Sequence, residues 1–383
     1  MKRMQAYQFQ LLPKNKHLAH IHEALGANRF VWNKLLAMNL HRLEHKLPIL
    51  WYQEMAWMIT LWKQSEDYSF LNQAPAQSLQ QTAKALDRAF RDAFDKKQPN
   101  KRLPQFKRLN KREAGIKYPQ HIVLDPGNSV IKIPKLGWVK YRNSRDVLGK
   151  IKNVTISRKH GQYMLSIQTE RDVENPSHPS STAVGIDLGV VHFATLSDGI
   201  VIKPKNSFKV LSEKLAKAQR KLKSKVKFSN NWKKQQKQIQ KVHTKIAYVR
   251  RDFLHQTSNT ISKNHAMIVM EDLKIRNMSK SASGTIEEPG RKVAQKSGLN
   301  RSILDQGWGE FCRQLEYKQG WRGGMVVYVD PKHTSQTCPI CGHLEKGNRL
   351  TQETFRCLEC FFEDNADSVA SQNILSRGLG CLN

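Results

Sequence analysis

The sequence predicts a multidomain α+β protein, and three observations support this prediction. At about 100 to 200 residues per domain, 383 residues suffice for about two or three domains with cores of their own. Short apolar runs bounded by Pro, Gly and Asn recur in both halves, and longer apolar repeats at three- and four-residue spacing separate them. The segment NPSHPSST at 175–182 has the composition of a linker and divides the chain.

In the first half, strands are expected to enclose a helical region. Tyr7, Phe9 and Leu11 alternate with polar residues, which predicts a strand with one buried face. Residues 15–95 carry helical periodicity and are predicted to form a helical bundle. Further strands are predicted around 130–133, 154–156 and 164–167. Together the strands are expected to close a small β-barrel, residues 1–14 and 96–180, into which the bundle is inserted.

The second half, residues 183–383, has the element order of an RNase H-like fold. Three short strands come first, followed by a basic helical hairpin, a buried strand, an amphipathic helix and a fifth strand. The strands are predicted at 184–188, 193–196, 200–202, 267–270 and 325–329, and the amphipathic helix at 303–315.

Three acids are placed as such a fold would place a metal-dependent nuclease site. Asp187 lies inside the first strand, Glu271 ends the fourth, and Asp367 lies on a helix after the fifth. An ionised carboxylate in an apolar strand is costly unless something pairs with it. Phosphodiester cleavage can use two Mg²⁺ ions, and Mg²⁺ takes oxygen ligands. We therefore expect Asp187 to bridge two Mg²⁺ ions, with Glu271 and Asp367 completing one site each.

Four of the six cysteines form two close pairs, which indicates a zinc site. Fifteen residues separate the two C-x₂-C pairs, a spacing that suits four thiolates around one tetrahedral Zn²⁺. The cysteines are Cys338, Cys341, Cys357 and Cys360. Four protein ligands leave no open position, so this zinc is expected to be structural.

The charge of the chain predicts a polyanionic partner. Lys and Arg number 64 against 32 Asp and Glu, which gives a formal net charge of +32. Such an excess is typical of proteins that bind nucleic acid. No stretch approaches ~18 consecutive apolar residues, and the opening residues lack the apolar core of a signal peptide. We expect a cytoplasmic protein without a membrane partner.

Several of these segments resemble the TnpB family of transposon-encoded proteins. VGIDLG at 184–189, VMEDL at 269–273 and DNADSVASQNIL at 364–375 are similar to its three RuvC motifs, and TSQTCPICG at 334–342 is similar to its zinc ribbon. The segments RFVWNKLL and LPQFK in the first half also resemble the family. Three residues depart from its usual pattern, with Phe361 in place of Gly, Val369 in place of Asn and Ser371 in place of Ala.

The resemblance implies an RNA-guided DNA endonuclease of a bacterial insertion sequence, associated with the nucleoid. The family uses a guide RNA from the transposon end, unwinds double-stranded DNA beside a short adjacent motif, and cuts it at a single RuvC site. In this chain the resemblance implies a wedge-like barrel domain (1–14 and 96–180), a helical recognition domain (15–95), a RuvC-like domain (183–383) and a zinc-ribbon insertion (334–363).

Contacts to nucleic acid are expected in the first half. Gln77, Gln81 and Lys84 are spaced for one helix face, and Gln can bind adenine edges in the major groove. By resemblance, this region meets the motif beside the target. The basic segment 96–112 is expected to contact phosphates of RNA or of an RNA–DNA duplex.

Three alternatives remain open at this point. A nuclease-inactive, RNA-guided DNA-binding repressor would keep the basic surface and the zinc site but lose acids, whereas all three acids are present here. A compact CRISPR effector would share the chemistry and be distinguished by an adjacent repeat array. A DNA-strand transposase is the third alternative, which the resemblance disfavours.

Overall fold

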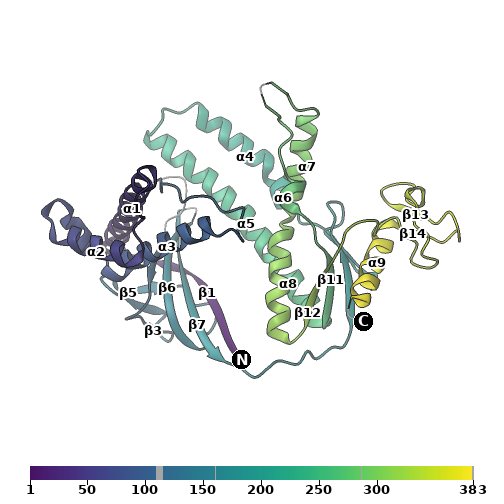
Figure 1. The fold of residues 1–383 in the computed structure, drawn as a ribbon, viewed down its shortest axis with the longest axis horizontal. Coiled ribbons are helices and arrows are strands. Elements are labelled where there is room, and N and C mark those ends of the chain that lie inside the picture. Colours follow the sequence, from purple (N-terminus) through teal and green to yellow (C-terminus); the bar gives the residue numbers. More distant parts are fainter. Residues whose placement is uncertain (109–114, 160, 286, 382–383) are drawn as a thin grey trace. The chain divides into compact units, whose positions relative to one another are not determined.

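Two parts of the chain, Met1–Glu174 and Asn175–Asn383, each combine a β-sheet with helices (Figure 1). The predicted mixed α+β class is therefore confirmed. The structure, a computed structural model, describes residues 1–108, 115–159, 161–285 and 287–381. Among these residues no helix combines the length and the apolar character needed to cross a membrane.

The sheet of the first part has seven antiparallel strands in the order β2-β6-β7-β1-β5-β4-β3. Its centre is the long pairing of β1 with β7, which sets Tyr7 opposite Ile167. The strands are β1 (Lys2–Leu12), β2 (Gly115–Tyr118), β3 (Val123–Asp125), β4 (Val130–Ile133), β5 (Gly137–Tyr141), β6 (Lys150–Lys159) and β7 (Gln162–Asp172).

Closure of this sheet into a barrel, which the sequence predicted, is not found. Within the described residues no ladder joins the two edge strands, β2 and β3. The prediction counted four strands, whereas three further strands of three to five residues extend the sheet, namely β2, β3 and β5. Strands this short carry too few alternations to be recognised from periodicity alone.

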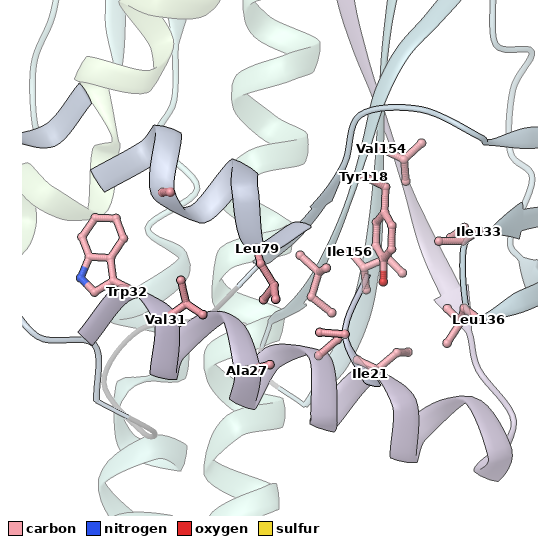
Figure 2. Close-up of a cluster of buried hydrophobic side chains, with 14 of the residues drawn as sticks. Ile21, Ala27, Val31, Trp32, Leu79, Tyr118, Ile133, Leu136, Val154 and Ile156 are labelled. Atoms are coloured by element: carbon pink, nitrogen blue, oxygen red, sulfur yellow. The ribbon is translucent and has the colours of Figure 1, made fainter. Parts of the chain in front are cut away.

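Helices of the first part pack against this sheet through a shared core. Ile21 and Val31 of α1, Leu79 of α3, and Val154 and Ile156 of β6 belong to one cluster of buried side chains (Figure 2). All five side chains are buried, so burial of the apolar helix faces stabilises both layers. The helices are α1 (Asn15–Glu44), α2 (Tyr52–Gln64), the 3₁₀ helix η1 (Glu66–Gln73) and α3 (Ala76–Phe94).

The sheet of the second part has five strands in the order β10-β9-β8-β11-β12. The central strands β8, β11 and β12 are parallel, and β9 and β10 continue the sheet in antiparallel pairing. The strands are β8 (Ala183–Asp187), β9 (Ala194–Leu196), β10 (Val201–Ile202), β11 (Met267–Glu271) and β12 (Met325–Val329). A separate hairpin pairs β13 (Thr354–Arg356) with β14 (Glu363–Asn365).

Helices cover both faces of the five-stranded sheet. Ile268 and Met270 of β11 pack in one core with Leu254 and Phe311, whereas Val269 packs on the opposite side in a cluster that includes α9. Strand β11 is apolar at successive positions because both faces are buried. The helices are α4 (Ser207–Lys223), α5 (Asn230–Asn264), α6 (Ile275–Met278), α7 (Val293–Gln306), α8 (Trp308–Arg322), the 3₁₀ helix η2 (Lys346–Asn348) and α9 (Ala366–Gly380).

The amphipathic helix predicted at 303–315 is in fact two helices. Gly307 adopts a φ of 75°, in the left-handed region, and this ends α7 and begins α8. The apolar spacing continues through the break, since Ile303, Phe311 and Leu315 all reach the same core. Periodicity alone therefore concealed the break.

Candidate active site and cysteine cluster

Two of the three predicted acids lie side by side where parallel strands end. Asp187 ends β8 and Glu271 ends β11. The register pairs Ile186 with Met270, so each acid is the next residue along its own strand. Because β8 and β11 run parallel, both carboxylates emerge at the same edge of the sheet.

The third acid is brought to this edge by close packing of α9 on the sheet. Gly185 lets the helix backbone approach, since a Cβ there would lie 2.2 Å from the carbonyl oxygen of Ser371. Gly378 meets Val269 in the same way, at 2.4 Å. Asp367 then lies in the first turn of α9, which is capped by the Asn365 side chain accepting from the Asp367 amide at 2.9 Å.

The electrostatics of the three acids favour a bound cation. Burial and, after it, the charges of Glu271 and Asp367 together raise the pKa of Asp187 to about 7, against the opposing charge of Arg349. Burial also raises the pKa of Glu271. Carboxylates whose charge is penalised by burial and by each other are a donor set that suits a hard divalent cation. The residues therefore fit Mg²⁺.

Four further residues contact or influence these acids and were not singled out from the sequence. His192 Nδ1 lies 3.3 Å from Asp367 Oδ2, and the Thr334 hydroxyl donates to Glu271 Oε1 at 2.6 Å. The charges of Arg349 and Arg377 partly oppose the rise that burial causes in the pKa of Asp187 and of Glu271, respectively. Thr334 is the first residue of TSQTCPICG, the segment that resembles the zinc ribbon. The sequence therefore marked this segment but could not predict the hydrogen bond of Thr334 to Glu271.

The four predicted cysteines come together in the structure. Their sulfur atoms all lie within 4.8 Å of one another, and Cys338 Sγ–Cys360 Sγ and Cys341 Sγ–Cys357 Sγ are each 3.5 Å apart. A tetrahedral Zn²⁺ with Zn–S bonds of about 2.3 Å separates its sulfurs by about 3.8 Å. The cluster therefore has the dimensions of a zinc-binding site. Among the described residues, these four cysteines are the one group of His, Cys, Asp or Glu side chains close enough together to hold a metal ion as they stand. The carboxylates of Asp187, Glu271 and Asp367 are therefore farther apart than the cysteine sulfurs.

Buried amides hold the cysteine cluster and α9 together. The side chain of Asn348 donates to the carbonyls of Gln336 and His343 and accepts from the Leu358 amide, which braces both cysteine loops. Asn373 of α9 donates to the carbonyls of Thr334 and Thr337, at 2.8 and 2.7 Å. The backbone leading to Cys338 is thus fixed to the helix that carries Asp367.

The three departures from the family pattern have different structural settings. Phe361 takes a φ of 60°, a left-handed conformation that glycine adopts without strain, and its amide donates to the Cys357 carbonyl at 3.1 Å. Val369 is fully buried in one cluster with Cys338 and Phe355. Ser371 is also fully buried, and its hydroxyl donates to the Ser368 carbonyl at 2.8 Å. All three residues are accommodated in the folded structure.

The predicted nucleic-acid contacts in the first part of the chain lie on α3 and on the segment that follows it. Gln77 and Gln81 are partly exposed and Lys84 is exposed, with its Nζ 4.8 Å from the centre of the Tyr52 ring. Residues 109–112 of the basic segment 96–112 lie outside the described residues.

The described end of the basic segment packs on α1. The carbonyl of Gln105 accepts from the Trp32 indole at 3.0 Å, and the Lys107 Nζ lies 3.6 Å from the Trp32 ring centre. Burial lowers the pKa of Lys107 to about 8. Lys107 therefore has a structural contact within the chain, with Trp32 of the RFVWNKLL segment of α1.

Comparisons with known proteins identify the family to which this chain belongs. The family model described as "Probable transposase" (OrfB_IS605) matches residues 166–282, and "Cas12f1-like, TNB domain" matches 308–374. The model "Helix-turn-helix domain" matches residues 1–47, which here form β1 and the single long helix α1. The chain belongs to the TnpB family.

Individual relatives support this membership over nearly the whole chain. InsQ of Escherichia coli K12, named as an RNA-guided DNA endonuclease, is 50% identical over 99% of this chain and 93% of its own length. A Streptomyces pristinaespiralis protein named likewise is 29% identical over 98% of this chain. Among solved structures, the Cas12f1–sgRNA–target DNA complex matches with a TM-score of 0.58 at 12% identity, covering 97% of this chain and 98% of that one. At that identity the match supports the fold alone.

Proposed function

We propose that this chain is an RNA-guided DNA endonuclease of an insertion sequence, which cleaves target DNA beside a short adjacent motif. The observation that carries the proposal is the meeting of Asp187, Glu271 and Asp367 at one sheet edge, in a chain 50% identical to a protein named as such an enzyme. The +32 charge suits an enzyme that holds both a guide RNA and double-stranded DNA.

The three acids are proposed to hold two Mg²⁺ ions in an RNase H-like, RuvC-type arrangement. Asp187, whose pKa is raised by burial and by the charges of both Glu271 and Asp367, would be the ligand shared by the two ions, and Glu271 and Asp367 would complete one site each. When bound, the two ions make an attacking water more nucleophilic and stabilise the departing oxygen.

The surrounding side chains orient these ligands. The Thr334 hydroxyl fixes one oxygen of Glu271, and His192 lies against Asp367, which limits rotation of both carboxylates before DNA arrives. Arg349 places a positive charge near Asp187.

The domain roles are proposals that rest on the family. Residues 1–14 and 96–180 would form the wedge-like domain, residues 15–95 the recognition domain and residues 183–383 the nuclease, with the zinc ribbon at 334–363. Gln77, Gln81 and Lys84 would meet the motif beside the target, since α3 leaves them at least partly exposed. Zn²⁺ in the cysteine cluster would hold the ribbon folded.

The proposal is tested by replacing two of the three proposed site acids and, as a control, one neighbouring acid outside the site. Asp187→Ala and Glu271→Ala should abolish Mg²⁺-dependent cleavage while preserving RNA-dependent DNA binding, because they remove metal ligands and no cation. Asp272→Ala is the matched control, since Asp272 is exposed and paired with Lys274. It should cut at the wild-type rate.

The same experiment separates the nuclease from the repressor. Wild-type protein that binds DNA through its RNA but does not cut with Mg²⁺ would favour the repressor. Undiminished cutting by Asp187→Ala would refute the site assignment.

A further inference from the structure

The tip of the helical hairpin formed by α4 and α5 exposes an aromatic pair. Phe228 is 64% exposed, and its ring centre lies 5.4 Å from that of the partly exposed Trp232. The Phe228 backbone has a φ of 67°, an unfavourable left-handed conformation for an aromatic residue. A large apolar ring held in water by a strained backbone is unfavourable in the isolated protein, which indicates that the ring serves a contact.

The surroundings of this pair are strongly and uniformly basic. From residue 214 to residue 251 the chain has fourteen Lys or Arg and no Asp or Glu. Five of these cations flank the pair, and in the part of the chain that the structure describes none of the five forms an ion pair. They are Lys223, Lys225, Lys227, Lys233 and Lys234.

The tip lies well away from the three acids. The part of α5 that packs in the sheet core includes Leu254 and Ile261. Twenty-four residues separate Leu254 from Asn230, the first residue of α5, which at a rise of about 1.5 Å per residue is about 36 Å. The aromatic pair is therefore too distant to contact the bond that is cut. Figure 1 shows α4 and α5 lying along each other as an antiparallel pair that ends in this tip.

We propose that Phe228 and Trp232 form a stacking platform for an unpaired base of the guide RNA, with the flanking lysines holding the adjoining phosphates. Aromatic rings combined with nearby cations are the usual means of binding unpaired bases. Guide RNA is favoured over the displaced DNA strand as the occupant, because the displaced strand must reach the acids to be cut and the aromatic pair is distant from them. This inference rests on the proposed function, since it requires that the chain carry a guide RNA.

The test uses the full-length protein and the RNA that co-purifies with it, sequenced and then transcribed. Binding is measured without DNA and without Mg²⁺, so that cleavage does not enter. The double variant Phe228→Ala, Trp232→Ala should bind this RNA about tenfold more weakly, the effect of losing one stacked base. The conservative double variant Phe228→Tyr, Trp232→Phe should stay within about twofold of wild type.

Salt dependence distinguishes stacking from general disruption of the hairpin. The alanine pair carries no charge change, so the slope of log Kd against log salt concentration should stay at its wild-type value. Lys225→Gln with Lys227→Gln should make that slope shallower by about 1.4, at about 0.7 per phosphate contact. Val210→Ala is the control for exposed apolar surface on the same hairpin, since Val210 is 73% exposed, and should leave the affinity unchanged.

Three results would overturn the inference. The first is that the double alanine variant binds RNA as tightly as wild type while Asp187→Ala still abolishes cutting. This result would leave the proposed function standing. Another is a loss that appears when target DNA is present and not with RNA alone, which would assign the platform to DNA. Absence of any co-purifying RNA would refute both this inference and the proposed function.

Discussion

Replacing Gly185 by alanine tests how the packing of α9 positions Asp367. The new Cβ would lie 2.2 Å from the Ser371 carbonyl oxygen, 2.7 Å from the Leu375 amide nitrogen and 2.9 Å from the Leu375 Cβ. Cβ atoms essentially never approach other heavy atoms to less than 3.0 Å. The helix must therefore move away from β8 by at least 3.0 − 2.2 = 0.8 Å, because the opposing atoms belong mainly to its backbone.

A displacement of this size has separate consequences for stability and for cleavage. Overpacking of a core by one methyl group costs about 1–3 kcal/mol, which in a domain of about 200 residues lowers the melting temperature by roughly 2 to 12 °C. A shift of about 1 Å in a reacting group can slow catalysis by about a hundredfold. We expect Gly185→Ala to remain folded, to bind RNA and to cut DNA about a hundredfold more slowly.

The assay is single-turnover cleavage of a matched DNA duplex by the saturated protein–RNA complex in Mg²⁺, with thermal unfolding measured alongside. Gly380→Ala is the matched control, since Gly380 also lies in α9 and its added Cβ would have no atom within 4 Å. It should cut at the wild-type rate. Wild-type cutting by Gly185→Ala, or an equal loss in both variants, would show that close packing at this glycine does not position the acid.

Three other perturbations have expected outcomes. Cys338→Ser should release Zn²⁺, disorder residues 338–360 and lower cleavage more than RNA binding; metal analysis that finds no zinc in active wild-type protein would contradict this. Because the pKa of Asp187 is raised from 3.8 to about 7, its proton competes with the metal below that pH. The Mg²⁺ concentration for half-maximal binding should therefore rise about tenfold for each pH unit below 7 and level off above pH 7. A flat profile from pH 5 to 8 would argue against an acid with a raised pKa in the site. Thr334→Val removes the hydroxyl that donates to Glu271, which should raise the pKa of that acid further and weaken Mg²⁺ binding several-fold in calorimetry, whereas Thr334→Ser should keep wild-type affinity.

The parts of the fold that could be predicted are those with a strong local pattern. Strand β11 was visible as a run of four apolar residues ending in an acid, and the cysteine pairs were visible from their spacing alone. The two long helices of the basic hairpin showed repeats over several turns. Each of these signals lies within one short stretch of sequence.

The parts that escaped prediction depend on contacts between distant segments. The strands β3 and β5 are too short to show a period, and the break at Gly307 leaves the apolar spacing undisturbed. His192 lies 175 residues from Asp367 in the chain, so no pattern around it could have announced their contact at 3.3 Å. The strand order and the positions of the acids predicted their roles, whereas their surroundings required the folded chain.

The spacing between Asp367 and the glycine that meets Val269 has a consequence for how this protein can vary. The interval is 378 − 367 = 11 residues, about three turns at 3.6 residues per turn, so both positions fall on the same side of α9. Inserting one residue between them would rotate the acid by about 100° relative to the sheet. Chain length should therefore be invariant within this interval. The ribbon loops can tolerate insertions, because Arg377 anchors the backbone before them through the carbonyls of Asp330 and Lys332.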